Sequence, residues 1–301
     1  MEAKTNKLDG RFVLLGLVLF ACGMAAGALW DLPLDKAVYR PASALTLGME
    51  AFGYYPIYLP LGLWLAYLAR GGAKKLWLRV LCAVLALAGC AGLALASYGN
   101  LDGRGAPLPA LTTALVWAAL AAGAAVLLRS RADARRLRFV FFWGSIYLAL
   151  DRVFIDLILK QIWDRTRFDD MLAAGSFADF TAWYQHGHGG TSFPSGHTSA
   201  ACGVLVLLLL CDVFPAWARR RRWVRAGCAA YVVLMAACRL VIGRHFLSDT
   251  VMGAAVMAVL FLCLTRSAPY RRGLAKVTAA LNAPPPAAGP DAAPAEKPSA
   301  G

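Results

Sequence analysis

The chain has 301 residues, 59% of them hydrophobic, and a formal net charge of +14 at pH 7. Soluble domains contain about 45–50% apolar residues, so this composition excludes an ordinary soluble domain. The excess of Lys and Arg could indicate nucleic-acid binding, but these residues gather in short loops between long apolar runs. That distribution is typical of a membrane topology signal, and we expect no nucleic-acid partner.

Eight apolar runs are each long enough to cross a hydrocarbon core of about 30 Å at about 1.5 Å per residue. In chain order they cover residues 12–30, 52–69, 77–97, 110–128, 139–160, 197–214, 224–242 and 248–265. A soluble amphipathic helix would alternate apolar and polar faces, which these runs do not. The sequence therefore predicts an all-α, polytopic membrane helix bundle with about eight transmembrane helices.

Basic residues mark alternate loops between these runs. Lys and Arg are concentrated at 70–79, 129–138 and 219–225, and the segments between them carry far fewer. Cytoplasmic loops of membrane proteins show this excess, so we expect both termini in the cytoplasm. Segments 160–197 and 239–249 would then lie together at the outer, periplasmic face of a multi-pass protein of the cell (inner) membrane.

The chain divides into a membrane domain and a tail. Residues 1–275 hold all eight runs, whereas residues 276–301 are rich in Ala and Pro and lack apolar periodicity. A segment of that composition buries too little apolar surface to fold, and we expect a disordered cytoplasmic tail. The eight cysteines lie within or at the ends of the runs without a C-x-x-C pair, which argues against a zinc site or a disulfide framework.

The longest outer loop, residues 161–196, contains aromatic residues at helical spacing. Phe177, Phe180, Trp183 and Tyr184 would fall on one side of a short helix. Such a helix would place the rings at the level of the lipid headgroups. The alternative is that these rings pack onto the bundle.

Polar residues gather at the outer ends of several runs, where they are costly and functional by default. Lys160 ends the fifth run and Arg167 follows seven residues later, so a continued helix would point both cations the same way. Pro194, Ser195, Gly196 and His197 form the second cluster, at the start of the sixth run.

The third cluster joins the last two runs. Arg239 closes the seventh run, and His245 and Asp249 lead into the eighth. His245 and Asp249 are four residues apart, which makes them neighbours on one face if that stretch is helical.

Together the three clusters supply cations, histidines, a carboxylate and the start of a helix, which suits a phosphate group. Arg binds phosphate oxygens bidentately and Lys acts as a point charge. A helix N-terminus adds N–H donors, and Ser195 and Gly196 would let the backbone approach an anion. Two histidines allow nucleophilic and acid–base roles, and a carboxylate can fix the tautomer of one of them. No Asp, Glu, His or Cys cluster has metal-ligand spacing, so we expect no metal and no other cofactor.

These residues resemble the signature of the type-2 phosphatidic acid phosphatase superfamily, K-x6-R-P, then P-S-G-H, then S-R-x5-H-x3-D. The chain has Lys160 and Arg167 for the first motif, residues 194–197 for the second, and Arg239, His245 and Asp249 for the third. The resemblance covers about residues 139–265. There are two departures, at the position after Arg167 and at the position before Arg239. Phe168 replaces the proline and Cys238 replaces the serine.

The resemblance implies a role for each matching residue. His245 would attack phosphorus and form a phosphohistidine, and Asp249 would hold His245 in the required tautomer. His197 would protonate the leaving oxygen and then activate water. The phosphate oxygens would be held by Lys160, Arg167, Arg239, Ser195 and the N–H group of Gly196.

The resemblance also implies a core of six transmembrane helices, so two of the eight expected helices would be additional to that core. We expect the additional pair at 77–97 and 110–128.

The fifth run carries further charges, with Arg152, Asp156 and Lys160 spaced by four residues on one stripe. Together with Asp151 they predict either support for the ammonium group of Lys160 or a buried ion pair that helps packing.

The leading functional hypothesis is an integral-membrane lipid phosphatase, a phosphoric monoester or diphosphate hydrolase that acts at the outer leaflet among membrane lipids. Lipid A, undecaprenyl diphosphate, phosphatidylglycerophosphate and phosphatidate are the candidate substrates, and the Trp163 region resembles the lipid A phosphatase branch. The alternatives are a lipid phosphotransferase that uses the same phosphohistidine and a non-enzymatic anion transporter. An anion pathway does not require a His-x3-Asp pair or a second histidine. The sequence leaves the oligomeric state open.

Overall fold

The computed structural model describes residues 10–101 and 131–282. Helices are the only regular elements in these two segments, which confirms the predicted all-α membrane bundle. Five of the described helical segments are long and apolar enough to cross a membrane. They are Val13–Val38, Leu76–Asn100, Gly196–Val213, Arg221–Val241 and Leu247–Arg266.

The helices vary from single turns to long spans. In chain order they are α1 (Gly10–Val38), α2 (Ala44–Phe52), η1 (Tyr55–Ile57), α3 (Leu59–Tyr67), η2 (Leu68–Gly72), α4 (Leu76–Leu101), α6 (Arg131–Asp151), η3 (Arg152–Leu159), α7 (Lys160–Trp163), α8 (Phe168–Ala173), α9 (Gly196–Ala201), η4 (Cys202–Val206), α10 (Leu207–Val213), α11 (Pro215–Arg219), α12 (Arg221–Val241), α13 (Leu247–Arg266) and α14 (Ala268–Asn282).

The predicted runs that fall on described residues correspond to these helices with two differences. Helix α1 continues beyond the expected end at residue 30 and carries Asp31 and Asp35 into the bundle. The run at 52–69 is divided among η1, α3 and η2 instead of forming one span. The run at 110–128 lies outside the described residues. Elsewhere α6 continues through η3 as one helical stretch over the predicted run at 139–160.

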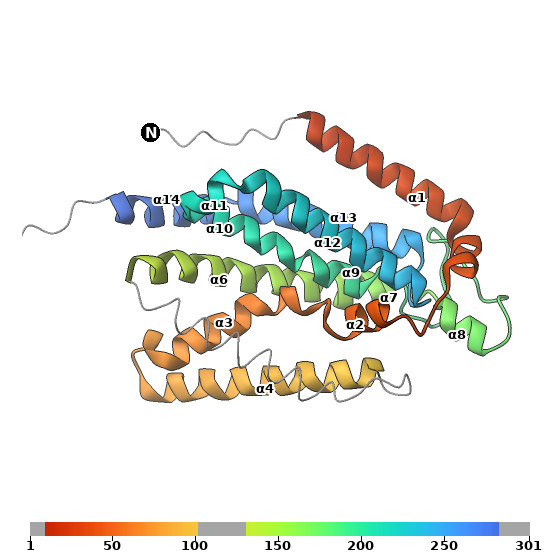
Figure 1. Cartoon of the computed structure of the whole chain (residues 1–301), viewed down its shortest axis with the longest axis horizontal. Coiled ribbons are helices and arrows are strands. Elements are labelled where there is room, and N and C mark those ends of the chain that lie inside the picture. The colour runs from red at the N-terminus through yellow and green to blue at the C-terminus, as the bar shows by residue number, and fades with distance from the viewer. Residues whose placement is uncertain (1–9, 102–130, 283–301) are drawn as a thin grey trace, which may run out of the picture.

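The long helices lie side by side along one axis, and the two ends of the bundle differ (Figure 1). Helix α8 and the loops around it lie at one end, whereas α11, α14, the start of α6 and the turn between α3 and α4 lie at the other. The second end therefore carries the basic segments at 70–79, 131–138 and 219–225. This separation agrees with the distribution of charge from which the sequence analysis assigned an orientation.

The outer surfaces of α1 and α4 are apolar. Leu14, Leu19, Leu87 and Leu95 each expose more than three-fifths of their surface. Exposed apolar faces of this extent suit helices that contact lipid.

Helices α1 and α13 approach each other closely because two glycines of α1 face α13. A Cβ atom added at Gly27 would lie 2.6 Å from Cβ of Ser248, and one added at Gly23 would lie 3.0 Å from Val251. Small residues allow such close contact between membrane helices. The contact brings Asp31, one turn beyond Gly27, beside the start of α13.

The outer loop and the tail depart from the expectations. Residues 177–186 form turns rather than a helix, so the predicted interfacial helix is wrong. Phe177 and Phe180 pack instead against Phe168 and Phe246, and the indole N–H of Trp183 donates to the carbonyl of Met24. Helix α14 extends to Asn282, into the segment expected to be a tail, and residues 283–301 lie outside the described residues.

The predicted orientation can be tested by cysteine labelling in a variant without the eight native cysteines. Ala178 is exposed in the outer loop and Ala218 is exposed in α11 at the basic end. We expect Ala178→Cys to react with a membrane-impermeant maleimide on intact spheroplasts, and Ala218→Cys to react only after permeabilisation. The opposite pattern would place the candidate site on the cytoplasmic side.

Candidate active site

The second motif forms the capped start of a helix. Ser195 is the N-cap of α9, and its hydroxyl accepts a hydrogen bond from the N–H of Thr198 at 3.3 Å. The same hydroxyl lies 3.0 Å from Oγ1 of Thr198 and is fully buried. The side chain expected to bind phosphate therefore stabilises the helix end in this structure.

Two glycines allow groups to approach this helix start. The ammonium nitrogen of Lys160 lies 2.7 Å from the place where a Cβ atom of Gly196 would be, and Gly253 leaves room for the carbonyl of Ser195. The structure thus brings the first motif against the second. The N–H groups at this helix start and the Lys160 ammonium can act on the same anion.

His245 is buried and its tautomer is determined by a backbone group. Its Nδ1 lies 2.7 Å from the carbonyl oxygen of Ser192. A carbonyl oxygen can only accept, so Nδ1 carries the proton and the lone pair of the neutral imidazole is on Nε2. This arrangement prepares Nε2 as a nucleophile.

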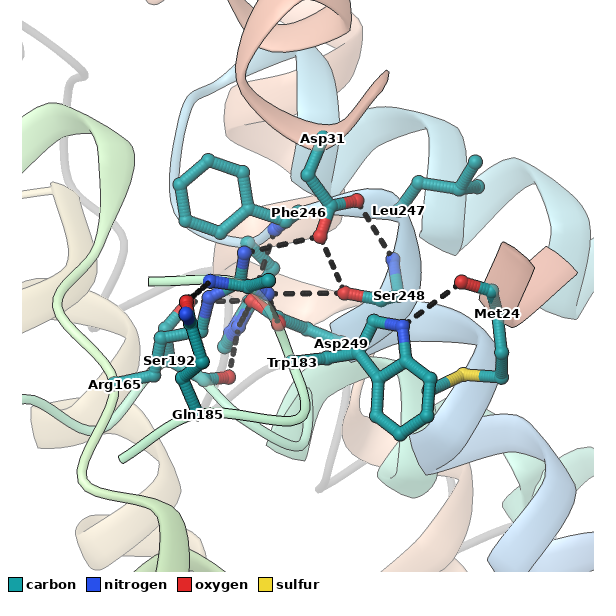
Figure 2. Close-up of polar contacts among 12 residues, drawn as sticks. Met24, Asp31, Arg165, Trp183, Gln185, Ser192, Phe246, Leu247, Ser248 and Asp249 are labelled. Atoms are coloured by element: carbon teal, nitrogen blue, oxygen red, sulfur yellow. Dashed lines mark hydrogen bonds and ion pairs between the residues drawn. The ribbon is translucent and has the colours of Figure 1, made fainter. Parts of the chain in front are cut away.

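Asp249 stands beside His245 but does not hold it in the expected way. Oδ2 of Asp249 lies 3.7 Å from Nδ1 of His245, beyond hydrogen-bond distance. Instead, Oδ2 accepts from the hydroxyl of Ser192 at 2.5 Å and from the N–H of Phe246 at 2.9 Å. Oδ1 accepts from Arg165 at 2.6 Å (Figure 2). Asp249 therefore acts on His245 through Ser192 rather than by direct contact.

The expected continuous helix between Lys160 and Arg167 is wrong. Helix α7 ends at Trp163, and Asp164 adopts a left-handed conformation with φ of 30°. Arg167 is the N-cap residue of α8, where its backbone is extended.

The first-motif cations nevertheless lie near both histidines, and they differ in their partners. Lys160 donates to Asp156 at 2.9 Å, and Asp156 also pairs with Arg152 at 2.5 Å. The stripe therefore forms ion pairs, which agree with both predicted roles, support of the Lys160 ammonium group and packing. Arg167 donates to the hydroxyl of Thr191 at 3.0 Å and has no ion pair among the described residues. Its pKa is lowered by burial and by the positive charge of Arg244, which is the situation of a cation that an anionic ligand would stabilise.

Arg239 has a partner that the sequence analysis missed. Its guanidinium forms an ion pair with Glu50 of α2, and both side chains are buried. Arg244 also lies near Glu50, at 3.8 Å, and pairs with Asp169 at 3.1 Å. Arg244 therefore adds a fourth cation to the predicted three.

Helix α2 also contacts the second histidine. Nε2 of His197 lies 3.1 Å from the carbonyl oxygen of Glu50, so Nε2 carries the proton and Nδ1 is the basic nitrogen. The ring of Tyr54 meets the His197 ring edge to face, with centroids 5.0 Å apart. A neutral imidazole held in this way can exchange a proton at Nδ1.

A hydrogen-bond network from α4 holds this part of the site. The hydroxyl of Ser97 donates to the carbonyl of Ala51 at 2.7 Å and lies 2.6 Å from the hydroxyl of Tyr55 and 3.2 Å from that of Tyr54. Helix α4 corresponds to the run at 77–97, which we expected to be additional to the core. Through Ser97 it positions α2 and hence the Glu50 contacts.

The charges around His245 show how close the three motifs come. Burial lowers the pKa of His245 well below its ordinary value, and the positive charges of Arg239 and Arg167, together with His197 and Lys160, lower the pKa further. Each predicted cation therefore acts on the candidate nucleophile. His245 remains neutral at physiological pH, which a nucleophilic imidazole requires.

The two departures from the family pattern leave these contacts intact. Phe168 is buried at the start of α8 and packs against Tyr39 and Phe246. Cys238 is buried within α12, and its carbonyl accepts from the N–H of Ile242. Within residues 10–101 and 131–282, no group of three or more His, Cys, Asp or Glu side chains is arranged to hold a metal ion.

Comparison with known proteins agrees with the motifs. Residues 140–273 match the model of the PAP2 superfamily, which confirms the resemblance drawn from the sequence and supports a phosphatase-type function. No curated protein sequence and no solved structure matches the chain. Glu50 and Asp31 both lie outside the matched residues.

The low pKa of His245 predicts a specific dependence on pH. The neutral imidazole is the reactive form, so kcat/KM should fall at acidic pH only when His245 becomes protonated. Arg239→Gln removes the positive charge that lowers the pKa of His245 most, so this pKa should rise and the acidic limb should move to higher pH.

Profiles of kcat/KM against pH, measured side by side, check this shift, because the ionisation of the substrate is common to both proteins. Arg222→Gln, an exposed charge at the basic end, should leave the limb in place. A limb that stays in place or moves to lower pH in Arg239→Gln would contradict the assignment.

Proposed function

We propose, on the premise that residues 140–273 form a PAP2-superfamily region, that this chain is an integral-membrane lipid phosphatase. It would hydrolyse a phosphate monoester or diphosphate of a membrane lipid through a phosphohistidine intermediate. The observation that carries the proposal is the convergence of two histidines of opposite tautomer with the predicted cations. Nε2 of His245 and Nδ1 of His197 are the nitrogens left without a proton.

In the first half-reaction Nε2 of His245 attacks phosphorus in line with the leaving oxygen. The N–P bond forms as the P–O bond to the lipid breaks, and the leaving oxygen takes a proton from Nδ1 of His197, which has first accepted that proton from the monoanionic phosphate of the substrate. Lys160, Arg167 and Arg239 would stabilise the charge on the other phosphate oxygens. Preorganised groups of this kind typically contribute about 3–4 kcal/mol per donor.

In the second half-reaction water replaces the lipid. Nδ1 of His197, now neutral, accepts a proton from water as the water oxygen attacks phosphorus. The N–P bond breaks, inorganic phosphate leaves, and His245 recovers its neutral form with the proton still on Nδ1. Both nitrogens that exchange protons or bonds are those that the backbone carbonyls of Ser192 and Glu50 leave available.

The location of the site favours a lipid substrate. The motifs lie toward the end of the bundle opposite the basic segments, next to helices whose outer faces are apolar (Figure 1). A headgroup phosphate at the outer leaflet could reach this position while its acyl or isoprenoid chains stay in the membrane. Lipid A, undecaprenyl diphosphate, phosphatidylglycerophosphate and phosphatidate are the candidates. Phosphate release from each by purified protein without an acceptor would separate hydrolysis from transfer to another lipid.

Substitution of the nucleophile tests the mechanism. His245→Ala should lose essentially all turnover, and His197→Ala should lose nearly all, while both proteins still insert and remain monodisperse in detergent. Acid-labile label from a phosphate-labelled lipid should appear in the wild type and be absent from His245→Ala. Full activity of His245→Ala would reject the covalent mechanism.

The use of side-chain cations predicts how the enzyme responds to chelators and oxyanions. Because Lys160, Arg167 and Arg239 would supply the positive charge, EDTA should leave phosphate release unchanged. Vanadate, which adopts the five-coordinate geometry of phosphoryl transfer, should inhibit competitively. Activity that is lost in EDTA and restored by magnesium or zinc would contradict this prediction.

A further inference from the structure

Arg165 joins helix α1 to the third motif within a buried network (Figure 2). Its side chain is fully buried in the loop between α7 and α8. Nη2 donates to Oδ2 of Asp31 at 3.0 Å, across 134 residues of sequence, and Nη1 donates to Oδ1 of Asp249 at 2.6 Å. Nη1 also donates to the hydroxyl of Ser248 at 2.9 Å.

From Asp249 the network reaches His245 in two steps. The hydroxyl of Ser192 donates to Asp249, and the carbonyl of the same Ser192 accepts from Nδ1–H of His245. The N–H of Phe246, next to His245 in the chain, also donates to Asp249. The orientation of the Asp249 carboxylate therefore controls both the residue that follows His245 and the residue that fixes its tautomer.

Asp31 accepts two hydrogen bonds from Ser248, in the first turn of α13. Its Oδ1 accepts from the N–H of Ser248 at 3.1 Å and its Oδ2 accepts from the hydroxyl of Ser248 at 2.5 Å. Both contacts favour a carboxylate, because a helix N-terminus stabilises negative charge. The close packing of α1 at Gly27 against Ser248 brings the carboxylate to this place.

The negative charge of Asp31 also changes the net charge beside the imidazole of His245. Arg165 paired with Asp249 alone would cancel the negative charge nearest the imidazole. With Asp31 present, one guanidinium is shared between two carboxylates, and the cluster keeps a net negative charge. That charge favours the imidazole as it becomes positive during formation of the N–P bond.

We propose that Asp31 is a positioning residue for the nucleophile, acting on His245 through Arg165 and Asp249. The proposal rests on the proposed function. It assigns to α1, outside the PAP2-matched residues, a part in the chemical step rather than in phosphate binding. The guanidinium of Arg165 lies over the ring of Phe246 at 4.1 Å and that of Phe180 at 5.4 Å, so these rings shield the connection from water.

Helix α1 offers a matched control for this role. Asp35 lies one turn beyond Asp31 and is equally buried, but neither of its carboxylate oxygens has a hydrogen-bond partner among the described residues. Asp31→Asn and Asp35→Asn make the same replacement in the same helix. Only the first removes a charge from the network that leads to His245.

The experiment measures kcat and the inhibition constant for inorganic phosphate in full-length protein purified in detergent. The substrate is whichever of the four candidate lipids the wild type hydrolyses fastest. Asp31→Asn should lower kcat by about 10- to 100-fold, the range expected when a reacting group is displaced by about 1 Å. Its inhibition constant for phosphate should stay within about threefold of the wild type, and Asp31→Glu should recover part of kcat. Asp35→Asn should keep kcat within about twofold.

The outcomes separate this inference from the function on which it rests. Equal kcat values for Asp31→Asn and Asp35→Asn, in a wild type that releases phosphate, would overturn the inference alone. A wild type inactive on all four lipids would reject the proposed function and the inference with it. If Asp31→Asn does not fold, Ser248→Ala decides, because it removes hydrogen bonds to Asp31 and Arg165 without changing charge. A kcat reduced about fivefold with unchanged phosphate inhibition would support the inference, and an unchanged kcat would overturn it.

Discussion

The buried guanidinium of Arg165 is the interaction on which the candidate site depends. It pairs with a carboxylate from α1 and another from α13, and the loop that carries it also carries Arg167. Removal of one partner from a buried ion pair leaves an uncompensated charge and typically costs about 3–5 kcal/mol. The three segments therefore cannot separate without a large loss of stability. Because Asp249 is fixed, Ser192 is fixed, and its carbonyl determines which nitrogen of His245 is free to react.

A second feature of the site is that most of its cations already have carboxylate partners. Lys160 pairs with Asp156, Arg239 with Glu50, and Arg244 with Asp169. A concentration of positive charge in a membrane protein is costly unless it is paired, so these carboxylates let the site form without a ligand. Arg167 differs because its partner is the neutral hydroxyl of Thr191. Among these four cations, a phosphate would gain most from Arg167, since the other three must share their charge with a neighbour.

The sequence predicted the all-α membrane bundle and the placement of the three motifs at one face, because motif spacing and hydropathy can be read from local sequence. It did not predict how the motifs meet. The helix expected from Lys160 to Arg167 ends at Trp163, and the two cations converge through a loop. Asp249 was expected to contact His245, but Ser192 stands between them. Glu50 and Asp31 were missed because their partners lie far away in sequence. The sequence did contain a signal for both. Each is an acidic residue next to a long apolar run, where a charged side chain is costly and therefore indicates a functional or structural partner.

The proposed mechanism places the covalent bond to phosphorus on one atom, Nε2 of His245. The phosphoenzyme, trapped by rapid quenching into base, can be digested and its modified peptide analysed by mass spectrometry and phosphorus NMR. We predict phosphate on Nε2 of His245, because Nδ1 is engaged by the Ser192 carbonyl. Phosphate on Nδ1 of His245, or on His197, would contradict the geometry from which the mechanism is built.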